Sequence, residues 1–249
     1  MKQGETIQLG EHLLVCGDCR NQADVDKLLA GKKIKSVITD PPYGVNYVKN
    51  KDWLGLRGSE ANHFKKFENI KGDELTGDKY IEFTEGWIKP ILNYIESYNS
   101  FYVFGCDLVF SELKKGAMNA GIYYSQMIIW IKNSIVLGRK DYNPQHELIL
   151  YGWYKRHKFY KSTARSIIFC PKPSRSKKHP TMKPVRLLRE LVLNSTKIGD
   201  YVYDGFGGSG STLIACEQTK RKCLMMEIDE HYCDVIVQRY SKYINQEKK

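Results

Sequence analysis

The chain has 249 residues, of which 42% are hydrophobic, and a formal net charge of +11. This length can bury the core of one α/β domain, and we expect a single domain over residues 1–249. Apolar runs of membrane-spanning length are missing and the first ten residues carry no apolar segment. A membrane span and a secretory signal are therefore not expected, and the predicted location is the cytoplasm.

Apolar runs and alternating patterns predict seven strands, at 12–16, 35–39, 101–105, 126–131, 147–151, 201–203 and 222–227. Helical patterns lie between or after them, at 24–30, 80–95, 184–195, 212–219 and 230–243. The alternation of strands with helices predicts an α/β fold with a mostly parallel sheet that helices cover on both faces.

Two segments do not fit this alternation. Residues 46–78 are long, polar and rich in Gly, Lys and Asn, as in a functional or mobile loop. Residues 151–178 carry nine Lys or Arg side chains and no Asp or Glu. Such a concentrated positive charge indicates a polyanion partner, with an ordinary solvated face as the alternative.

The run that ends the second predicted strand stops abruptly at Asp40, and the next residues read PPYG. Prolines restrict their own φ angle and disfavour helical conformations in the residue before them. The motif therefore predicts a rigid acidic turn at a strand end. A purely structural turn, in which the Asp caps a helix and Tyr43 packs, is the alternative.

A second motif, DGFGGSGST, begins at Asp204 directly after a strand and opens a helix. Gly205, Gly207 and Gly210 satisfy GxGxxG, and Glu227 closes the next strand, which is the layout of a nucleotide site. A phosphate-binding loop is a poor alternative because Ser211, not lysine, follows Gly210. Only 39 residues follow Gly210, so the strands that complete the sheet must precede it in permuted order. An NAD-dependent enzyme would rarely be built in this order.

Three motifs in this order, DPPYG at 40–44, HPTMKPV at 179–185 and DGFGGSGST at 204–212, resemble the β-class amino-methyltransferases of bacterial DNA. The resemblance covers nearly the whole chain and implies a Rossmann-like, seven-stranded sheet in circularly permuted order, with S-adenosylmethionine as cofactor. The chain departs from the family pattern at Met182, Gly205 and Ser211, where the family often has Gln, Pro and Thr. None of these changes removes a reacting group.

An exocyclic amine is a poor nucleophile, so its enzyme must orient the nitrogen and accept its hydrogens as positive charge develops. The resemblance implies that Asp40 and the carbonyl of Pro41 are these acceptors, that Pro42 helps to fix them, and that Tyr43 stacks on a flipped base. An Asp at the first position of the motif is associated with adenine N6 in this family. Cytosine N4 or RNA as target, and a catalytically silent DNA-binding subunit, stay as alternatives.

The resemblance also implies the partners of the protein. The cofactor would be bound by Asp18, Thr181, Lys183, Asp204, Phe206, Gly208, Ser209, Gly210 and Glu227. Double-stranded DNA would be contacted by insertions at 46–78 and 151–178 and by the loop near 139, through Lys49, Arg57, Arg139, Lys155, Arg156, Lys158, Arg165 and Arg175. A homodimer is possible for this family, and methyl transfer requires no metal.

The seven cysteines do not form the pattern of a disulfide framework. Cys16 and Cys19 have CxxC spacing, but no second pair of ligands follows at the spacing of a zinc site. We therefore expect both to be reduced structural thiols.

Overall fold

The computed structural model describes residues 1–43, 75–135, 141–161, 163–172 and 182–247. Within these ranges ten strands form one sheet in the order β1-β2-β10-β9-β3-β4-β6-β5-β8, and β7 pairs separately with β4. The strands are β1 (Thr6–Leu9), β2 (His12–Cys16), β3 (Ile34–Thr39), β4 (Ile95–Gly105), β5 (Ile122–Ile131), β6 (His146–Tyr154), β7 (Arg156–His157), β8 (Ile167–Phe169), β9 (Tyr201–Asp204) and β10 (Lys222–Glu227).

The centre of the sheet is parallel and its margins are partly antiparallel. Strands β2, β10, β9, β3 and β4 run parallel to one another. Strand β1 is antiparallel to β2, while β6 is antiparallel to both β4 and β5. Because β9 and β10 come last in the chain yet lie between β2 and β3, the predicted permuted order is confirmed.

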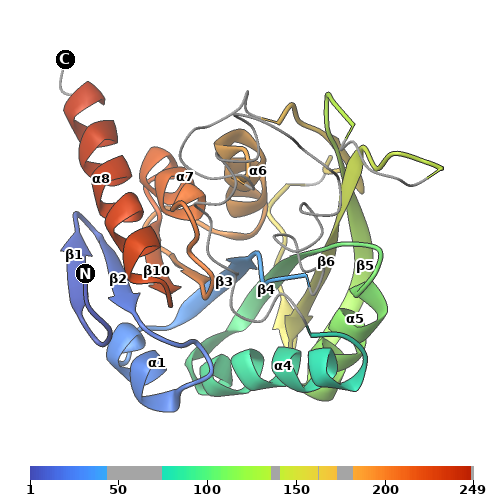
Figure 1. The fold of residues 1–249 in the computed structure, drawn as a ribbon, viewed down its shortest axis with the longest axis horizontal. Helices are drawn as coiled ribbons and strands as arrows, with labels where there is room; N and C mark the ends of the chain where they lie inside the picture. The colour runs from blue at the N-terminus through green and yellow to red at the C-terminus, as the bar shows by residue number, and fades with distance from the viewer. Residues whose placement is uncertain (44–74, 136–140, 162, 173–181, 248–249) are drawn as a thin grey trace, which may run out of the picture.

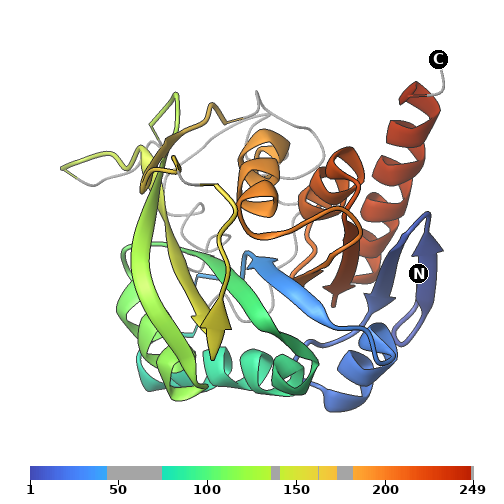
Figure 2. The ribbon, with the colours of Figure 1, turned by 180° about the vertical axis from the view of Figure 1, so that it is seen from behind.

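Helices cover both faces of the sheet (Figure 1). One face carries α6 (Val185–Ser195), α7 (Ser211–Thr219) and α8 (Glu230–Glu247), and the other carries α1 (Gln22–Leu29), α4 (Asp78–Ile88) and α5 (Phe110–Asn119). The view from behind shows the same two layers (Figure 2). Among the described residues, no helix has the length and apolar character that a bilayer crossing requires.

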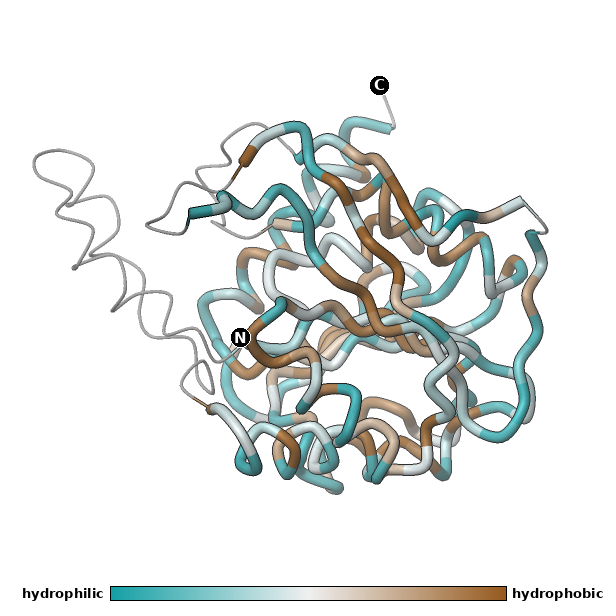
Figure 3. The backbone as a smooth tube through the Cα atoms, turned by 90° about the vertical axis from the view of Figure 1, so that its right-hand side faces the viewer, coloured by the Kyte–Doolittle hydropathy of each residue, from teal (hydrophilic) through white to brown (hydrophobic). Residues whose placement is uncertain are grey.

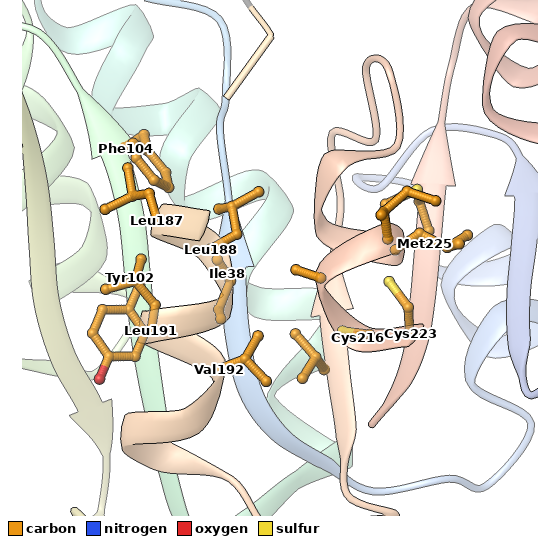
Figure 4. Close-up of a cluster of buried hydrophobic side chains, with 14 of the residues drawn as sticks. Ile38, Tyr102, Phe104, Leu187, Leu188, Leu191, Val192, Cys216, Cys223 and Met225 are labelled. Atoms are coloured by element: carbon orange, nitrogen blue, oxygen red, sulfur yellow. The ribbon is translucent and has the colours of Figure 1, made fainter. Parts of the chain in front are cut away.

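Each face of the sheet has its own hydrophobic core, and hydrophobic stretches concentrate at the centre of the molecule (Figure 3). Figure 4 shows the core under α6 and α7, where helix side chains meet those of the central strands; it labels Ile38, Tyr102, Phe104, Leu187, Leu188, Leu191, Val192, Cys216, Cys223 and Met225. Burying a side chain such as Leu191 stabilises the fold by roughly 1.5–3 kcal/mol. This packing fixes α6 and α7 over the strand ends discussed below.

The predicted elements differ from the observed ones in four places, and the described residues form ten strands where seven were predicted. The helix predicted over 80–95 ends at Ile88, because Pro90 cannot continue the α-helical hydrogen bonds, and the 3₁₀-helix η1 (Lys89–Tyr94) leads into β4. Helix α5 was not predicted, since its sequence is largely polar and contains Gly116. The basic segment was predicted as an insertion outside the alternation, but it contains β7 and β8, and β1 was not predicted.

Close packing between α4 and α5 gives a first prediction. A Cβ atom on Gly116 would lie 2.6 Å from the Thr84 Cβ and 2.8 Å from the Ile81 carbonyl oxygen. Gly116→Ala should therefore destabilise the protein by about 1–3 kcal/mol in chemical denaturation. The matched control is Gly86→Ala in α4, where the added Cβ would meet only Arg20 side-chain carbons at 3.9 Å. That change should stabilise by about 0.5–1 kcal/mol, and equal effects of the two variants would contradict the packing argument.

Candidate active site

Four acidic residues lie at one edge of the sheet. Cys16, Thr39, Asp204 and Glu227 end the neighbouring parallel strands β2, β3, β9 and β10. Asp18 follows β2 and Asp40 follows β3, so their carboxyls join those of Asp204 and Glu227 at the carboxyl ends of the strands. Open α/β sheets bind their ligands at this edge.

A hydrogen bond connects the two predicted motifs directly. The Thr39 hydroxyl donates to Asp204 Oδ1 over 2.7 Å, although the two residues are 165 apart in the sequence. The same Thr39 oxygen accepts from the Gly205 backbone N–H at 3.2 Å. The acidic turn and the glycine loop are therefore two halves of one site, as the order of motifs predicted.

Each oxygen of the Asp40 carboxylate accepts a hydrogen bond from a neighbouring side chain. Lys183 Nζ donates to Asp40 Oδ2 over 2.5 Å, and the Tyr43 hydroxyl donates to Oδ1, also over 2.5 Å. Burial raises the pKa of Asp40, and the Lys183 ammonium limits that rise. Tyr80 braces the same turn, because its hydroxyl donates to the Pro42 carbonyl oxygen over 2.9 Å.

Two charged residues that the sequence did not single out complete this cluster. Glu147 Oε2 lies 3.1 Å from Lys183 Nζ, and Glu147 Oε1 lies 2.7 Å from Lys132 Nζ. The two ammonium groups hold the pKa of Glu147 at about 2 despite its burial. Glu147 was read only as the start of a strand, and no local motif marks it. We call Asp40, Tyr43, Lys132, Glu147 and Lys183 the charged cluster.

A hollow opens between the acidic turn and the glycine loop. It holds about 380 Å³ of empty space, open solvent included, and is lined by Thr39, Asp40, Phe104, Met182, Lys183, Leu188, Asp204, Phe206, Gly207, Gly208, Ser209, Ser211 and Thr212. Gly208 and Gly210 take positive φ angles of 51° and 76°, which side chains rarely adopt. The loop backbone can thus turn tightly around whatever occupies the hollow.

The carboxyls on the glycine-loop side are buried and hydrogen-bonded to backbone. Glu227 accepts from the Gly208 N–H at 2.7 Å and from the Asp229 N–H at 2.9 Å. Asp204 accepts from the Phe206 N–H at 3.1 Å. Burial raises the pKa values of Asp204 and Glu227 to about 7, so both carboxyls are poised to respond to a ligand's charge.

Three other residues that were predicted to bind the cofactor are held in place by contacts of their own. Asp18 forms an ion pair with Arg20 at 2.6 Å. The Phe206 ring meets Trp87 edge-on with centroids 5.8 Å apart. Ser209 is held by Arg239 of α8, whose Nη1 donates to the Ser209 carbonyl over 2.8 Å. Arg239 was not predicted, because α8 carries only an amphipathic pattern there.

Of the predicted DNA-contacting residues that the structure describes, three lie at the opposite end of the strands from this edge. Strand β7 pairs with Tyr98 and Asn99 near the start of β4, so Lys155, Arg156 and Lys158 lie toward the amino end of that strand, opposite Asp40. Arg165 precedes β8. Thr181 and four of the predicted DNA contacts fall outside the described residues: Lys49, Arg57, Arg139 and Arg175.

Cys16 and Cys19 are free, buried thiols. Burial raises the pKa values of both thiols, so neither is disposed to act as a thiolate. Across the described ranges, His, Cys, Asp and Glu side chains form no group of three or more suited to a metal ion.

The sequence of this chain is similar to those of known proteins. A family model described as DNA methylase matches residues 34–238. The Type II methyltransferase M.HpaI of Haemophilus parainfluenzae is 24% identical over 91% of this chain and 74% of its own length. M.HinfI of Haemophilus influenzae is 25% identical over 90% of this chain and 66% of its own.

Solved structures share the fold. A complex of M1.HpyAVI with SAM superposes with a TM-score of 0.64 at 20% identity, covering 91% of this chain and 98% of that one. The cytosine-N4-specific PvuII DNA methyltransferase gives a TM-score of 0.67 at 18% identity, covering 91% and 84%. The predicted methyltransferase fold is therefore confirmed.

Proposed function

The chain belongs to the N6/N4 DNA methylase family, whose methyl donor is S-adenosylmethionine, and we propose that it methylates adenine N6 in double-stranded DNA at specific sequences. The observation that supports this most is the position of Asp40. Its carboxylate stands on the wall of the hollow formed by the glycine loop, one residue from the Thr39 contact to Asp204. An amine held by Asp40 would face a cofactor in that hollow.

The preference for adenine rests on Asp40 itself. In the resembling family, Asp at the first position of the motif accompanies adenine N6 as target. The fold does not separate the two targets, since a cytosine-N4-specific enzyme shares it. Cytosine N4 is therefore the second candidate.

In the proposed reaction, Asp40 and the Pro41 carbonyl accept hydrogen bonds from the two N–H groups of the target amine, which orients its lone pair toward the hollow. One of these two protons leaves the nitrogen once it is methylated. Lys183, at 2.5 Å, favours the ionised form of Asp40 that this task needs. The Tyr43 hydroxyl now occupies Asp40 Oδ1, so an entering amine takes over that oxygen. The Tyr43 ring then offers a stacking face to the flipped base, worth roughly 1–3 kcal/mol.

The residues around the hollow fit S-adenosylmethionine. Its sulfonium is a cation, and Asp204 lines the hollow with a carboxyl group. When bound, the cofactor supplies an electrophilic methyl group. We assign Glu227 to the ribose hydroxyls, Asp18 to the cofactor adenine, and Asp204, Phe206, Gly208, Ser209 and Gly210 to the methionine moiety.

Lys183 and Thr181 were expected at the methionine carboxylate. The contacts of Lys183 to Asp40 and Glu147 favour a place in the catalytic half of the site instead. Thr181 lies outside the described residues, so its assignment stays a prediction.

DNA would approach the edge that carries Asp40, because the target base must reach the hollow. Lys172, which follows β8 at this edge, has its pKa lowered by burial and by the nearby lysines. The basic residues near β7 lie away from this edge, so we propose for them at most contacts to DNA that extends around the protein. A homodimer stays a prediction.

The test is mass analysis of nucleosides after incubation of the protein with S-adenosylmethionine and unmethylated DNA of high sequence complexity. We expect N6-methyladenine in DNA and no modification of an RNA of matched sequence. N4-methylcytosine as the sole product would contradict the adenine assignment. Failure of the pure protein to bind S-adenosylmethionine in calorimetry would instead support a silent subunit.

A further inference from the structure

Glu147 reaches the candidate site from a strand that carries none of the three motifs. Strand β6 is antiparallel to β4, with Leu148 paired to Gly105, so its first residues lie where β4 ends. The amino end of an antiparallel strand thus shares an edge with the carboxyl ends of the parallel strands. The pairing of the strands therefore brings Glu147 near Asp40, although the two residues are far apart in the sequence.

Lys183 is shared between two carboxylates. Its Nζ lies 2.5 Å from Asp40 Oδ2 and 3.1 Å from Glu147 Oε2, and its side chain is only 8% exposed. The Tyr43 hydroxyl bridges the same two acids, at 2.5 Å from Asp40 and 3.3 Å from Glu147. Among the described residues, both groups that hydrogen-bond to the Asp40 carboxylate are therefore also in contact with Glu147.

Lys132 balances the second acid. It contacts Glu147 Oε1 at 2.7 Å, and its side chain is 5% exposed. The charged cluster thus contains two carboxylates and two ammonium groups, which is the balance that a buried site needs. Without Glu147, the charge of Lys183 would fall on Asp40 alone, and Lys132 would be buried without its ion-pair partner.

An acceptor that is wholly occupied by an ammonium group binds a weakly acidic amine hydrogen poorly. We propose that Glu147 is a positioning residue for methyl transfer: it draws Lys183 and the Tyr43 hydroxyl partly away from Asp40, so that Asp40 can accept the hydrogen of the substrate amine. Lys132 keeps Glu147 in place. This inference rests on the proposed role of Asp40 and adds the residue that makes Asp40 available.

The pH dependence gives a readout that a structural role would not move. The charge of Glu147 raises the pKa of Asp40, so its removal should lower that pKa and shift the acid limb of the kcat profile to lower pH. Among the residues that the structure describes, the other titratable or charged groups that face the cluster are Cys106, Lys172 and Asp204. They are unchanged in the variants below.

The experiment measures methyl transfer to unmethylated DNA of high sequence complexity across pH 5.5–9. For Glu147→Gln we expect kcat to fall about 10- to 100-fold, with the Kd of S-adenosylmethionine changed by less than about threefold. Its acid limb should move to lower pH. Wild-type kcat together with a wild-type pH profile would overturn the inference.

Loss of stability alone is separated by a second variant and a control. The double variant Lys132→Met with Glu147→Gln removes both members of the ion pair, so its melting temperature should recover toward wild type while kcat stays low. Recovery of kcat together with stability would overturn the inference. Glu96→Gln breaks the matched pair of Glu96 with Lys35, 3.1 Å apart at the other end of β4, and should leave kcat unchanged.

Failure of this inference is distinguishable from failure of the proposed function. If Asp40→Ala is inactive while Glu147→Gln behaves as wild type, the role of Asp40 stands and that of Glu147 fails. If Asp40→Ala is itself active, the proposed function fails, whatever Glu147→Gln does.

Discussion

Replacing Asp40 with Ala should lower kcat for methyl transfer by about 10³-fold or more, while the Kd of S-adenosylmethionine stays within about threefold of wild type. Asp40 belongs to the acidic turn, whereas the residues assigned to the cofactor belong mainly to the glycine loop. The substitution should also leave the fold intact, because Lys183 keeps Glu147 as a partner at 3.1 Å. Single-turnover methylation and calorimetry with the cofactor measure the two effects separately.

The control for this substitution is Asp200→Ala. Asp200 caps the turn before β9 by accepting from the Lys197 N–H at 2.7 Å, at the opposite end of the strand that ends in Asp204. Its replacement should leave kcat unchanged. Turnover at the wild-type rate in Asp40→Ala would remove Asp40 from the mechanism, and loss of cofactor binding would show that the two halves of the site are not separable.

Glu227→Gln should weaken S-adenosylmethionine binding by about 10- to 100-fold, since hydrogen bonds to a charged group are worth about 1.5–3 kcal/mol. The carboxylate has both oxygens placed by the Gly208 and Asp229 N–H groups, so it is fixed for a ligand's hydroxyls. A neutral amide offers only one accepting oxygen. Equilibrium binding of the cofactor measures the loss.

The pH dependence of binding follows from the pKa of about 7 that burial gives Glu227. The ionised carboxylate is the form that accepts two ribose hydroxyls, so affinity should fall as pH drops from 8 to 6. In Glu227→Gln, the part of this pH dependence of affinity that comes from Glu227 should be lost, and the part that comes from Asp204 should stay. The control is Glu217→Gln. Glu217 lies on α7 and pairs with His12 of β2, so this change should leave the Kd of S-adenosylmethionine unchanged. An unchanged Kd in Glu227→Gln would contradict the ribose assignment.

Much of the sheet could be predicted because its central strands are buried on both sides. Strands β3, β9 and β10 contain short apolar runs, at 37–38, 201–203 and 223–226, and these runs marked the strands in the sequence. Helix α5 gave no such signal, since only Leu113, Gly116 and Ala117 are buried in it. The end of α4 was mispredicted because the helical pattern of apolar residues continues past Pro90, whereas the α-helix ends before it.

The candidate site could be predicted where its residues belong to local motifs. Asp40 and the glycines of the loop each belong to a contiguous motif, which can be recognised from the sequence alone. Glu147, Lys132 and Arg239 carry none, because their places depend on strand pairing and helix packing across the fold. The charge of the basic segment was visible in the sequence, but only the pairing of β7 with β4 shows at which end of the strands Lys155 and Arg156 lie.

The most direct test is to sequence modified bases in the DNA of a methylation-free host that expresses either the wild-type protein or Asp40→Ala. The wild type should leave N6-methyladenine at one short sequence throughout the genome, and the variant should leave none. N4-methylcytosine in place of N6-methyladenine, or the same modified sites with both proteins, would contradict the assignment of Asp40 as the acceptor for an adenine amine.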